Sequence, residues 1–245
     1  MDADRRMRLW GLVVQCARGA PVELGHVCDA AISAANVDSV ALAVTGSATP
    51  RETLYVSDPF ASVLEELALT LGEGPGVDAL AGGVVQAADI TDAASMARWP
   101  VFAPAAVQAG ARAVFALPVQ AGGIRLGVMD LYRSQPGGLD GEQLADALIL
   151  ADTACALLLD LAGQGQAEQG LAGQSPGRVY PGGPEPVGGQ HPVVHQATGM
   201  LIVQLGVSAA VAMIRLRAYA YAHERRLRDV AADVVARRLR FESEG

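Results

Sequence analysis

The apolar residues in the first two thirds of the chain alternate between helical and strand spacing. Leu9, Leu12, Val13 and Cys16 fall on one helical face, and residues 24–35 repeat that spacing after Pro21. Short apolar runs at residues 39–45, 53–57 and 84–87 are typical of strands, whereas residues 60–71 return to helical spacing and end at Gly72. Spacings of three and four residues indicate helices with one buried side, and short apolar runs between polar turns indicate strands.

Residues 113–133 carry the clearest strand pattern, two apolar runs on either side of Gly122 and Gly123. A glycine pair suits the backbone of a tight hairpin turn. Pro118 cannot donate a backbone hydrogen bond, so its strand is expected to lie partly at an edge or near a bulge. After the hairpin, a helix is predicted to begin at Asp140, where Gln143 completes a capping box. Its buried stripe comprises Leu144, Leu148, Ala151, Cys155 and Leu158. The pattern predicts an α+β domain over residues 1–162, an antiparallel sheet with helices at both sequence ends.

Residues 163–190 contain nine Gly and four Pro among twenty-eight residues. Such a segment buries too little apolar surface to offset the entropy lost on ordering. We therefore expect a flexible linker between the N-terminal domain and a second domain over residues 191–241.

The second domain is predicted to contain three short helices. Val194, Ala197, Leu201 and Leu205 form the first stripe, Gly206 ends that helix, and Ser208 caps the next. The second helix has two apolar sides, which predicts contact with its own bundle on one side and with something else on the other. The stripes run through Ala212, Leu216, Tyr219 and His223, and through Ile214, Ala218, Tyr221 and Arg225. The third helix repeats helical spacing from Leu227 to Val235, and Asp233 is placed to pair with Arg237.

Charge divides the chain in the same way. Residues 191–245 hold eight Arg against five acidic residues, a balance of +3, whereas residues 1–190 hold ten Arg against twenty-one acids, or −11. A basic segment attached to an acidic one predicts an anionic partner, with nucleic acid as the first candidate.

Several chemistries are excluded or disfavoured. The chain has no Lys, so it holds no P-loop or Schiff-base lysine, and the GEGPG loop at residues 72–76 is interpreted as a tight turn into a helix. The spacing of Cys16, Cys28 and Cys155 fits inert buried thiols of a reducing cytoplasm rather than a cofactor attachment. His191 and His195 lack a third metal ligand nearby. We therefore expect no catalytic residues, no metal, no cofactor and no enzyme activity.

The N-terminal region resembles a GAF domain, a small-molecule sensor fold of bacterial regulators. The resemblance spans about residues 20–162 and is carried by LGEGPGVDAL (71–80), RWPVFAPAAVQAGARAVFALPVQ (98–120) and RLGVMDLYRSQPGGLD (125–140). It is strongest toward the GAF modules that precede RNA-binding tails in actinobacterial regulators. Members of this type often carry Cys after GEGP, where this chain has Gly76.

The ligand of this domain is not evident from the sequence. Trp99, Phe102 and Phe115 are candidates for lining a ligand pocket, with core packing as the alternative. The domain is expected to sense an unknown small-molecule or protein signal, or to mediate homodimerisation. Leu157, Leu159 and Leu161 would extend the apolar surface of its last helix into a four-helix dimer seam.

The C-terminal region resembles the ANTAR domain, a three-helix RNA-binding module of antitermination regulators. The matching pieces are QATGML (196–201), AMIRLRAYA (212–220) and LRDVAADVV (227–235). The family usually places Lys where this chain has Thr198, so one phosphate contact is absent or is made by another residue. The resemblance implies binding to paired hairpins in a leader transcript, which prevents a terminator hairpin from forming.

Arginine neutralises phosphate and stacks on bases, and tyrosine offers a platform for unpaired bases. The expected RNA contacts are Arg215, Arg217, Tyr221, Arg225, Arg226 and Arg228. Two alternatives remain, a tail that serves only for dimerisation or protein interaction, and a DNA-binding helical module. A cytoplasmic protein without a membrane segment is expected, because the long apolar stretch at residues 145–162 carries three Asp.

Overall fold

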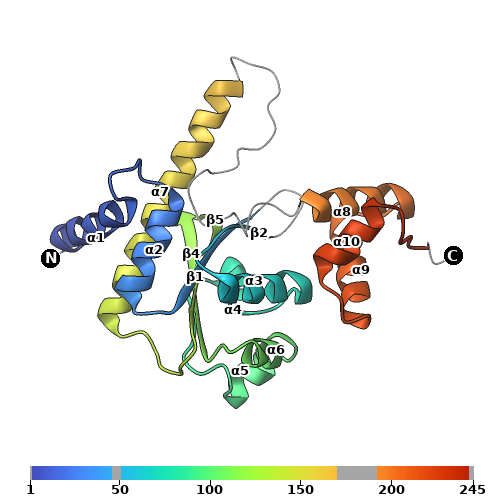
Figure 1. Ribbon diagram of the computed structural model, residues 1–245, viewed down its shortest axis with the longest axis horizontal. Helices are drawn as coiled ribbons and strands as arrows, with labels where there is room; N and C mark the ends of the chain where they lie inside the picture. The colour runs from blue at the N-terminus through green and yellow to red at the C-terminus, as the bar shows by residue number, and fades with distance from the viewer. Residues whose placement is uncertain (1, 46–50, 170–191, 243–245) are drawn as a thin grey trace.

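The computed structural model describes residues 2–45, 51–169 and 192–242, with only the backbone given for residues 2 and 163–169. Its centre is one antiparallel sheet of five strands in the order β2-β1-β5-β4-β3 (Figure 1). The strands are β1 (Ser39–Val44), β2 (Glu52–Val56), β3 (Val85–Ala87), β4 (Ala113–Ala121) and β5 (Ile124–Arg133). Helices flank this sheet, so the predicted α+β class is confirmed.

Each face of the sheet has its own core. On one face, α1 (Asp2–Ala17), α2 (Leu24–Ala35) and α7 (Gly141–Gln169) pack on Val40, Leu42 and Phe115. On the other face lie α3 (Pro59–Leu71), α4 (Pro75–Gly82), α5 (Ala93–Arg98) and α6 (Phe102–Gln108). Successive strand residues point to opposite faces, which is why Ala41 and Ala43 belong to the second core while Val40 and Leu42 belong to the first. The sequence patterns did not resolve the short helices α5 and α6.

The β4–β5 hairpin has the predicted turn. Ala121 pairs with Ile124, and Gly122 between them has a φ of 58°, which glycine adopts without strain. Pro118 lies opposite Val128 on β5, but β3 pairs only with residues 114–116 of β4. Pro118 therefore lies where β4 no longer pairs with β3, one residue before the register shift between Val119 and Gln120, as expected of a proline at an edge or near a bulge.

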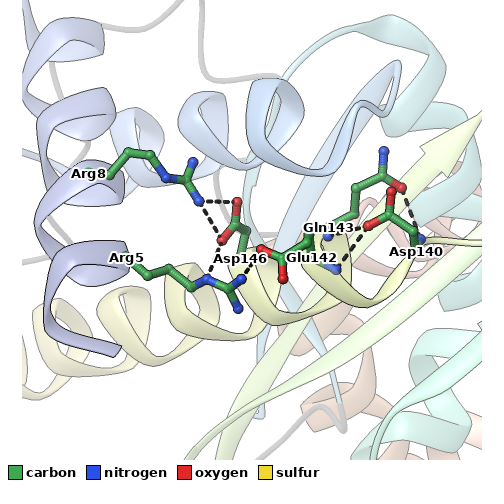
Figure 2. A network of polar contacts seen from close by, with 6 residues as sticks. All are labelled: Arg5, Arg8, Asp140, Glu142, Gln143 and Asp146. Atoms are coloured by element: carbon green, nitrogen blue, oxygen red, sulfur yellow. Dashed lines mark hydrogen bonds and ion pairs between the residues drawn. The ribbon is translucent and has the colours of Figure 1, made fainter. Parts of the chain in front are cut away.

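Helix α7 is held at its start by the predicted capping box and by arginines of α1 (Figure 2). The backbone nitrogen of Gln143 donates to Asp140 Oδ1 at 2.8 Å, and the backbone nitrogen of Asp140 donates to Gln143 Oε1 at 3.1 Å. Arg8 Nη2 contacts both oxygens of the buried Asp146 at 2.6 and 2.8 Å, and Arg5 pairs with Asp146 and Glu142. These ion pairs attach α1 to α7.

The start of the predicted linker overlaps the end of α7. Helix α7 continues to Gln169, so the backbone of residues 163–169 is helical. The cause is local, because Gln, Ala and Glu at residues 164–169 favour helix and outweigh the cost of Gly163 and Gly165. The remainder of the predicted linker, residues 170–190, lies outside the described residues.

The three predicted C-terminal helices are present as α8 (Pro192–Leu205), α9 (Ala209–Ala222) and α10 (Leu227–Val235). Gly206 ends α8 with a φ of 65°, and Ser208 Oγ accepts from the backbone nitrogen of Val211 at the start of α9. The helices enclose a core of their own, and Leu69 of α3 joins it. The core residues include Val194, Ala197, Leu201, Ala212, Leu216, Leu227 and Val230.

A buried charged cluster joins α3 to the sheet. Arg51, which directly precedes β2, donates to Glu65 of α3 and to Asp130 of β5, with 2.5 Å between Arg51 Nη2 and Asp130 Oδ2. Tyr132 Oη donates to Glu65 Oε1 at 2.6 Å, and Thr53 Oγ1 donates to Glu65 Oε2 at 2.9 Å. The Arg51 side chain is only 3% exposed. Such a pair is costly to desolvate, so removing one member leaves an uncompensated buried charge.

Gly76 leaves room for this cluster. A Cβ atom at position 76 would lie 2.1 Å from Arg51 Nη1 and 2.7 Å from both carboxylate oxygens of Asp130. The Cys that related sequences often carry after GEGP would therefore collide with the Arg51 guanidinium in this chain.

We expect Gly76→Ala to lower the free energy of unfolding by about 1–3 kcal/mol, because the added methyl group displaces the Arg51 guanidinium. The matched control is Gly82→Ala at the end of α4, where a Cβ would meet nothing within 4 Å. Urea unfolding of both variants tests this. Equal stability of the two variants would contradict the steric role assigned to Gly76.

Candidate functional site

The three aromatic residues predicted to line a pocket do not face one another. Trp99 and Phe102 are buried in the core beneath α3 and α6, whereas Phe115 lies in the core on the opposite face of the sheet. Alternation along β4 is the reason, since Phe115 points away from the neighbouring Val114 and Ala116. The prediction that all three residues line one pocket is therefore wrong. A role of Trp99 and Phe102 in ligand binding stays a prediction.

Trp99 and Phe102 are held by acidic residues around the GEGPG turn. Trp99 Nε1 donates to Asp78 Oδ2 at 3.1 Å, and the backbone nitrogen of Phe102 donates to Glu73 Oε1 at 2.6 Å. The Phe102 ring lies against Gly74. These contacts attach α4 to the segment containing α5 and α6, which accounts for the conformation of the turn without a bound ligand.

The charged cluster around Arg51 contains two carboxyl groups whose pKa values are shifted in opposite directions. Burial, together with the nearby Glu65 carboxylate, raises the pKa of Asp130 to about 7, although Arg51 opposes the rise. The Arg51 guanidinium and its hydrogen bonds, together with those from Tyr132 and Thr53, lower the pKa of Glu65 despite its burial. One guanidinium thus balances one carboxylate, and the second carboxyl group, that of Asp130, keeps its proton below about pH 7.

Sequence reasoning missed this cluster. Glu65 lies beside Leu64 in a helix that is otherwise apolar toward the sheet, and Asp130 interrupts the alternation of β5. The sequence did contain a signal for this cluster, because Glu65 and Asp130 are charged residues at positions whose spacing predicts burial in the core. Their partner, Arg51, is 79 residues from Asp130 along the chain.

The C-terminal residues predicted to bind RNA are distributed over several surfaces. Arg217 and Arg226 contact the N-terminal domain, and Arg225 Nη2 is bound to Asp233 Oδ2 at 2.7 Å. Arg215 Nη1 donates to the carbonyl oxygen of Glu242 at 3.3 Å. Arg228 lies 3.8 Å from Asp229 on the exposed side of α10. The structure therefore does not gather these arginines on one face.

Helix α3 supports the C-terminal helices through polar contacts as well as through Leu69. Arg217 Nε donates to the carbonyl oxygen of Leu69 at 2.9 Å, and burial lowers the pKa of Arg217. The backbone nitrogen of Leu227 lies 3.4 Å from Thr70 Oγ1, and Arg226 Nη1 lies 3.4 Å from Glu66 Oε2. Arg217 is therefore a packing residue in this arrangement and is only partly exposed.

The second apolar side predicted for α9 is exposed. Ile214 and Tyr221 are 62% and 60% exposed, whereas Ala212, Met213, Leu216 and Ala220 are buried. Tyr219 stacks on His223 with 3.9 Å between ring centroids and contacts Phe241 edge-on. Tyr221 thus presents a free aromatic face, and Tyr219 does not.

Two local predictions near α8 and α10 are resolved by helix geometry. Asp233 pairs with Arg225 and Arg238 instead of Arg237, because α10 ends at Val235 and Arg237 turns away with a φ of 59°. Thr198 is buried, and its hydroxyl donates to the carbonyl oxygen of Val194 at 2.8 Å. Any phosphate contact near position 198 must therefore come from another residue.

Two further sequence interpretations concern metals and membranes. Among the described residues no group of three or more His, Cys, Asp or Glu is placed to hold a metal ion, and His191 lies outside them. His195 Nε2 lies 3.9 Å from Glu52 Oε2. Within the same part of the chain, no single helix is long and apolar enough to cross a bilayer; α8 and α9 reach that length only together, across a 109° bend.

The three C-terminal helices correspond to a known family. Residues 190–235 match the ANTAR domain. This match covers α8, α9 and α10 and leaves the N-terminal domain outside it. The sequence matches no curated protein.

Two solved bacterial domains have some similarity to this chain. A domain of a two-component sensor histidine kinase from Sinorhizobium meliloti is 15% identical, with a TM-score of 0.48, over 60% of this chain and 94% of that one. The GAF domain of a phosphoenolpyruvate-protein phosphotransferase from Coxiella burnetii is 14% identical, with a TM-score of 0.46, over 68% of this chain and 99% of that one. The fold class rests on the strand order and not on these similarities.

The raised pKa of Asp130 predicts a pH-dependent stability. Between about pH 4 and pH 7 the unfolded chain has released the Asp130 proton that the folded chain keeps, so the free energy of unfolding falls as the pH rises through this range. Asp130→Asn, which stays uncharged, is expected to flatten this dependence. Urea unfolding at several pH values from 5 to 8 measures it.

The matched control is Asp160→Asn on the exposed side of α7, which should keep the pH dependence of the unaltered chain. An unchanged pH dependence in Asp130→Asn would show that another group holds the proton.

Proposed function

We propose that this protein is an RNA-binding transcriptional regulator that acts by antitermination at paired hairpins of a leader transcript. The observation that carries the proposal is the match of residues 190–235 to the ANTAR domain, over helices that enclose a core of their own. In this proposal the helices bind a hairpin and prevent a terminator from forming. The protein acts in the cytoplasm and is of the actinobacterial type.

The charge and surface of the C-terminal helices support this function. Residues 191–245 carry a net charge of +3 in a chain whose total is −8. Tyr221 is exposed for stacking on an unpaired base, and Arg228 is exposed next to the start of α10. Arginine and an accessible aromatic ring are the residue types that bind single-stranded loops.

The N-terminal domain is proposed to receive an unidentified signal, or to bring two copies of the chain together. The contacts of α3 with Arg217, Arg226 and Leu227 link it to the RNA-binding helices. A signal that moves α3 would therefore act on the helices directly.

Binding of the full chain to a labelled RNA hairpin tests this function. We expect the affinity to fall steeply as salt rises, because each neutralised phosphate releases counterions. The hairpin should outcompete duplex DNA of equal charge. Tighter binding to the duplex would favour a DNA-binding module, and no binding to either would favour a tail used only for protein interaction.

Arg225→Ala combined with Arg226→Ala is expected to weaken hairpin binding while the fold remains intact. Both side chains form ion pairs at the surface, with Asp233 and Glu66, and such pairs contribute little to stability. Fluorescence anisotropy measures the affinity, and circular dichroism checks the fold.

The matched control is Arg6→Ala with Arg98→Ala, which removes two exposed, ion-paired arginines from the N-terminal domain. If the two double variants bind the hairpin equally well, Arg225 and Arg226 are not part of the RNA site.

We also propose a homodimer formed through the helices on one face of the sheet. Met7, Trp10 and Val14 are exposed and lie on one side of α1, because their spacing follows the helical repeat. Of the three leucines predicted to form the seam, only Leu159 is exposed; Leu157 and Leu161 pack on the core of their own domain. The seam is therefore proposed to run along α1 and to include Leu159.

Trp10→Glu is expected to convert the dimer into a monomer, because it places a charge in an apolar contact. Sedimentation velocity measures the change. Val63→Glu, which places the same charge at an exposed position of α3 on the other face, is the control. A dimer that withstands Trp10→Glu would place the interface elsewhere.

A further inference from the structure

The C-terminal helices form a groove that none of the RNA contacts predicted from the sequence lines. It lies between α8 and the chain that follows α10 and has a volume of about 570 Å³. Its apolar lining comes from Met200 and Val203 of α8, Val234 of α10, and Leu239. Gln196, Arg237 and Arg240 are among its polar lining residues. The volume falls in the range of about 300–1,000 Å³ that is typical of small-ligand sites.

The groove is open at its α8 side. A Cβ atom built on Gly199 would meet no heavy atom within 4 Å, and Val203 is 86% exposed. The inward stripe of α8, including Val194, Ala197 and Leu201, is buried in the bundle. Helix α8 therefore carries apolar residues on its outer side that its own bundle does not cover.

The charge at this groove is not balanced. Eight arginines lie between residue 191 and residue 245. Six of them form a hydrogen bond or an ion pair, whereas the side chains of Arg237 and Arg240 form none with the described residues. No carboxylate is among the described residues that line the groove. A ligand that suits it has a flat apolar part for the lining and negative charge for the two guanidinium groups.

We propose that this groove holds an unpaired base of the bound RNA, with the flanking phosphates on Arg237 and Arg240. The proposal rests on the proposed RNA-binding function and names the part of the surface that reads the loop. Unpaired bases pack against side chains and bond through their edges, and the Gln196 amide offers both a donor and an acceptor. The groove shares no residue with the contacts to α3, so a base reaches it while the helices are docked.

A second copy of the chain fits the groove less well. A symmetric contact brings the same patch of both copies together. Here it would place four guanidinium groups side by side, with no carboxylate among the lining residues that the structure describes. Repulsion therefore disfavours a dimer through this surface and favours a polyanion.

Two independent variants of the full chain test the groove. Gly199→Leu fills it without changing charge, and leucine is a better helix former than glycine, so α8 is expected to persist. Arg237→Ala with Arg240→Ala removes the charge and leaves the apolar lining. The probe is an RNA hairpin selected on the unaltered chain from a pool with a randomised loop, and fluorescence anisotropy measures the dissociation constant.

We expect Gly199→Leu to weaken binding by about tenfold or more, the loss that follows from excluding one stacked base. The arginine double variant should weaken binding by about 10- to 100-fold, and its log–log salt dependence should become shallower by about 1.4, as expected for two lost phosphates of a single strand. A loop base replaced by 2-aminopurine should change its fluorescence on binding the unaltered chain and not on binding Gly199→Leu.

The matched controls are Gly82→Leu, an exposed glycine with open space around it, and Arg6→Ala with Arg18→Ala, two exposed arginines of the N-terminal domain. Both should bind the hairpin as the unaltered chain does. Circular dichroism checks that each variant is folded; if Gly199→Leu unfolds, the arginine variant and its salt dependence decide alone.

The outcomes separate the two proposals. If the unaltered chain selects no hairpin, the RNA-binding function and the groove proposal both fail. If it binds a hairpin and folded groove variants bind equally well, only the groove assignment fails. If Gly199→Leu instead turns a dimer into a monomer in sedimentation velocity, the groove is a contact between copies and the proposal is overturned.

Discussion

The buried contact of Arg51 with Glu65 and Asp130 is the interaction on which the rest of the structure depends. It joins the start of β2, the middle of α3 and the centre of β5, and it explains why Gly76 carries no side chain. Because two carboxylates share one guanidinium and both are buried, the pKa of Asp130 rises to about 7, and the cluster carries an extra proton below that pH. The position of α3 follows from this cluster. Helix α3 in turn supplies Leu69, Thr70 and Glu66, against which the C-terminal helices pack (Figure 1).

Much of the fold was predictable because it depends on local rules. The β4–β5 hairpin follows from Gly122 and Gly123, the start of α7 from Asp140 and Gln143, and the break between α8 and α9 from Gly206 and Ser208. The candidate site was less predictable because its contacts are distant in sequence. Arg217 bonds to Leu69, 148 residues away, and Phe115 was grouped with Trp99 although strand alternation places them on opposite faces. Spacing along the chain predicts which residues share one face of a helix or strand, but it does not identify the distant residue that each of them contacts.

The arginines of the C-terminal helices have two different roles. Arg217 and Arg226 contact α3, and Arg225 and Arg238 share Asp233, so their charge is partly used within the protein. Arg237 and Arg240 have no such partner among the described residues, and they line the apolar groove that we propose as the site of an unpaired base. The net charge of +3 therefore does not show how many guanidinium groups are available to a ligand on any one side of the helices. This division accounts for a module that packs on an acidic domain and still presents a basic surface.

The central claim is that RNA binds to the helices that follow residue 191. Ultraviolet crosslinking of the full chain to hairpin RNA, followed by mass spectrometry of the crosslinked peptides, tests it most directly. The account predicts crosslinks in peptides from residues 192–242, with those of α8 and of the segment after α10 among them. Crosslinks confined to the N-terminal domain, or no crosslinks with any hairpin, would contradict it.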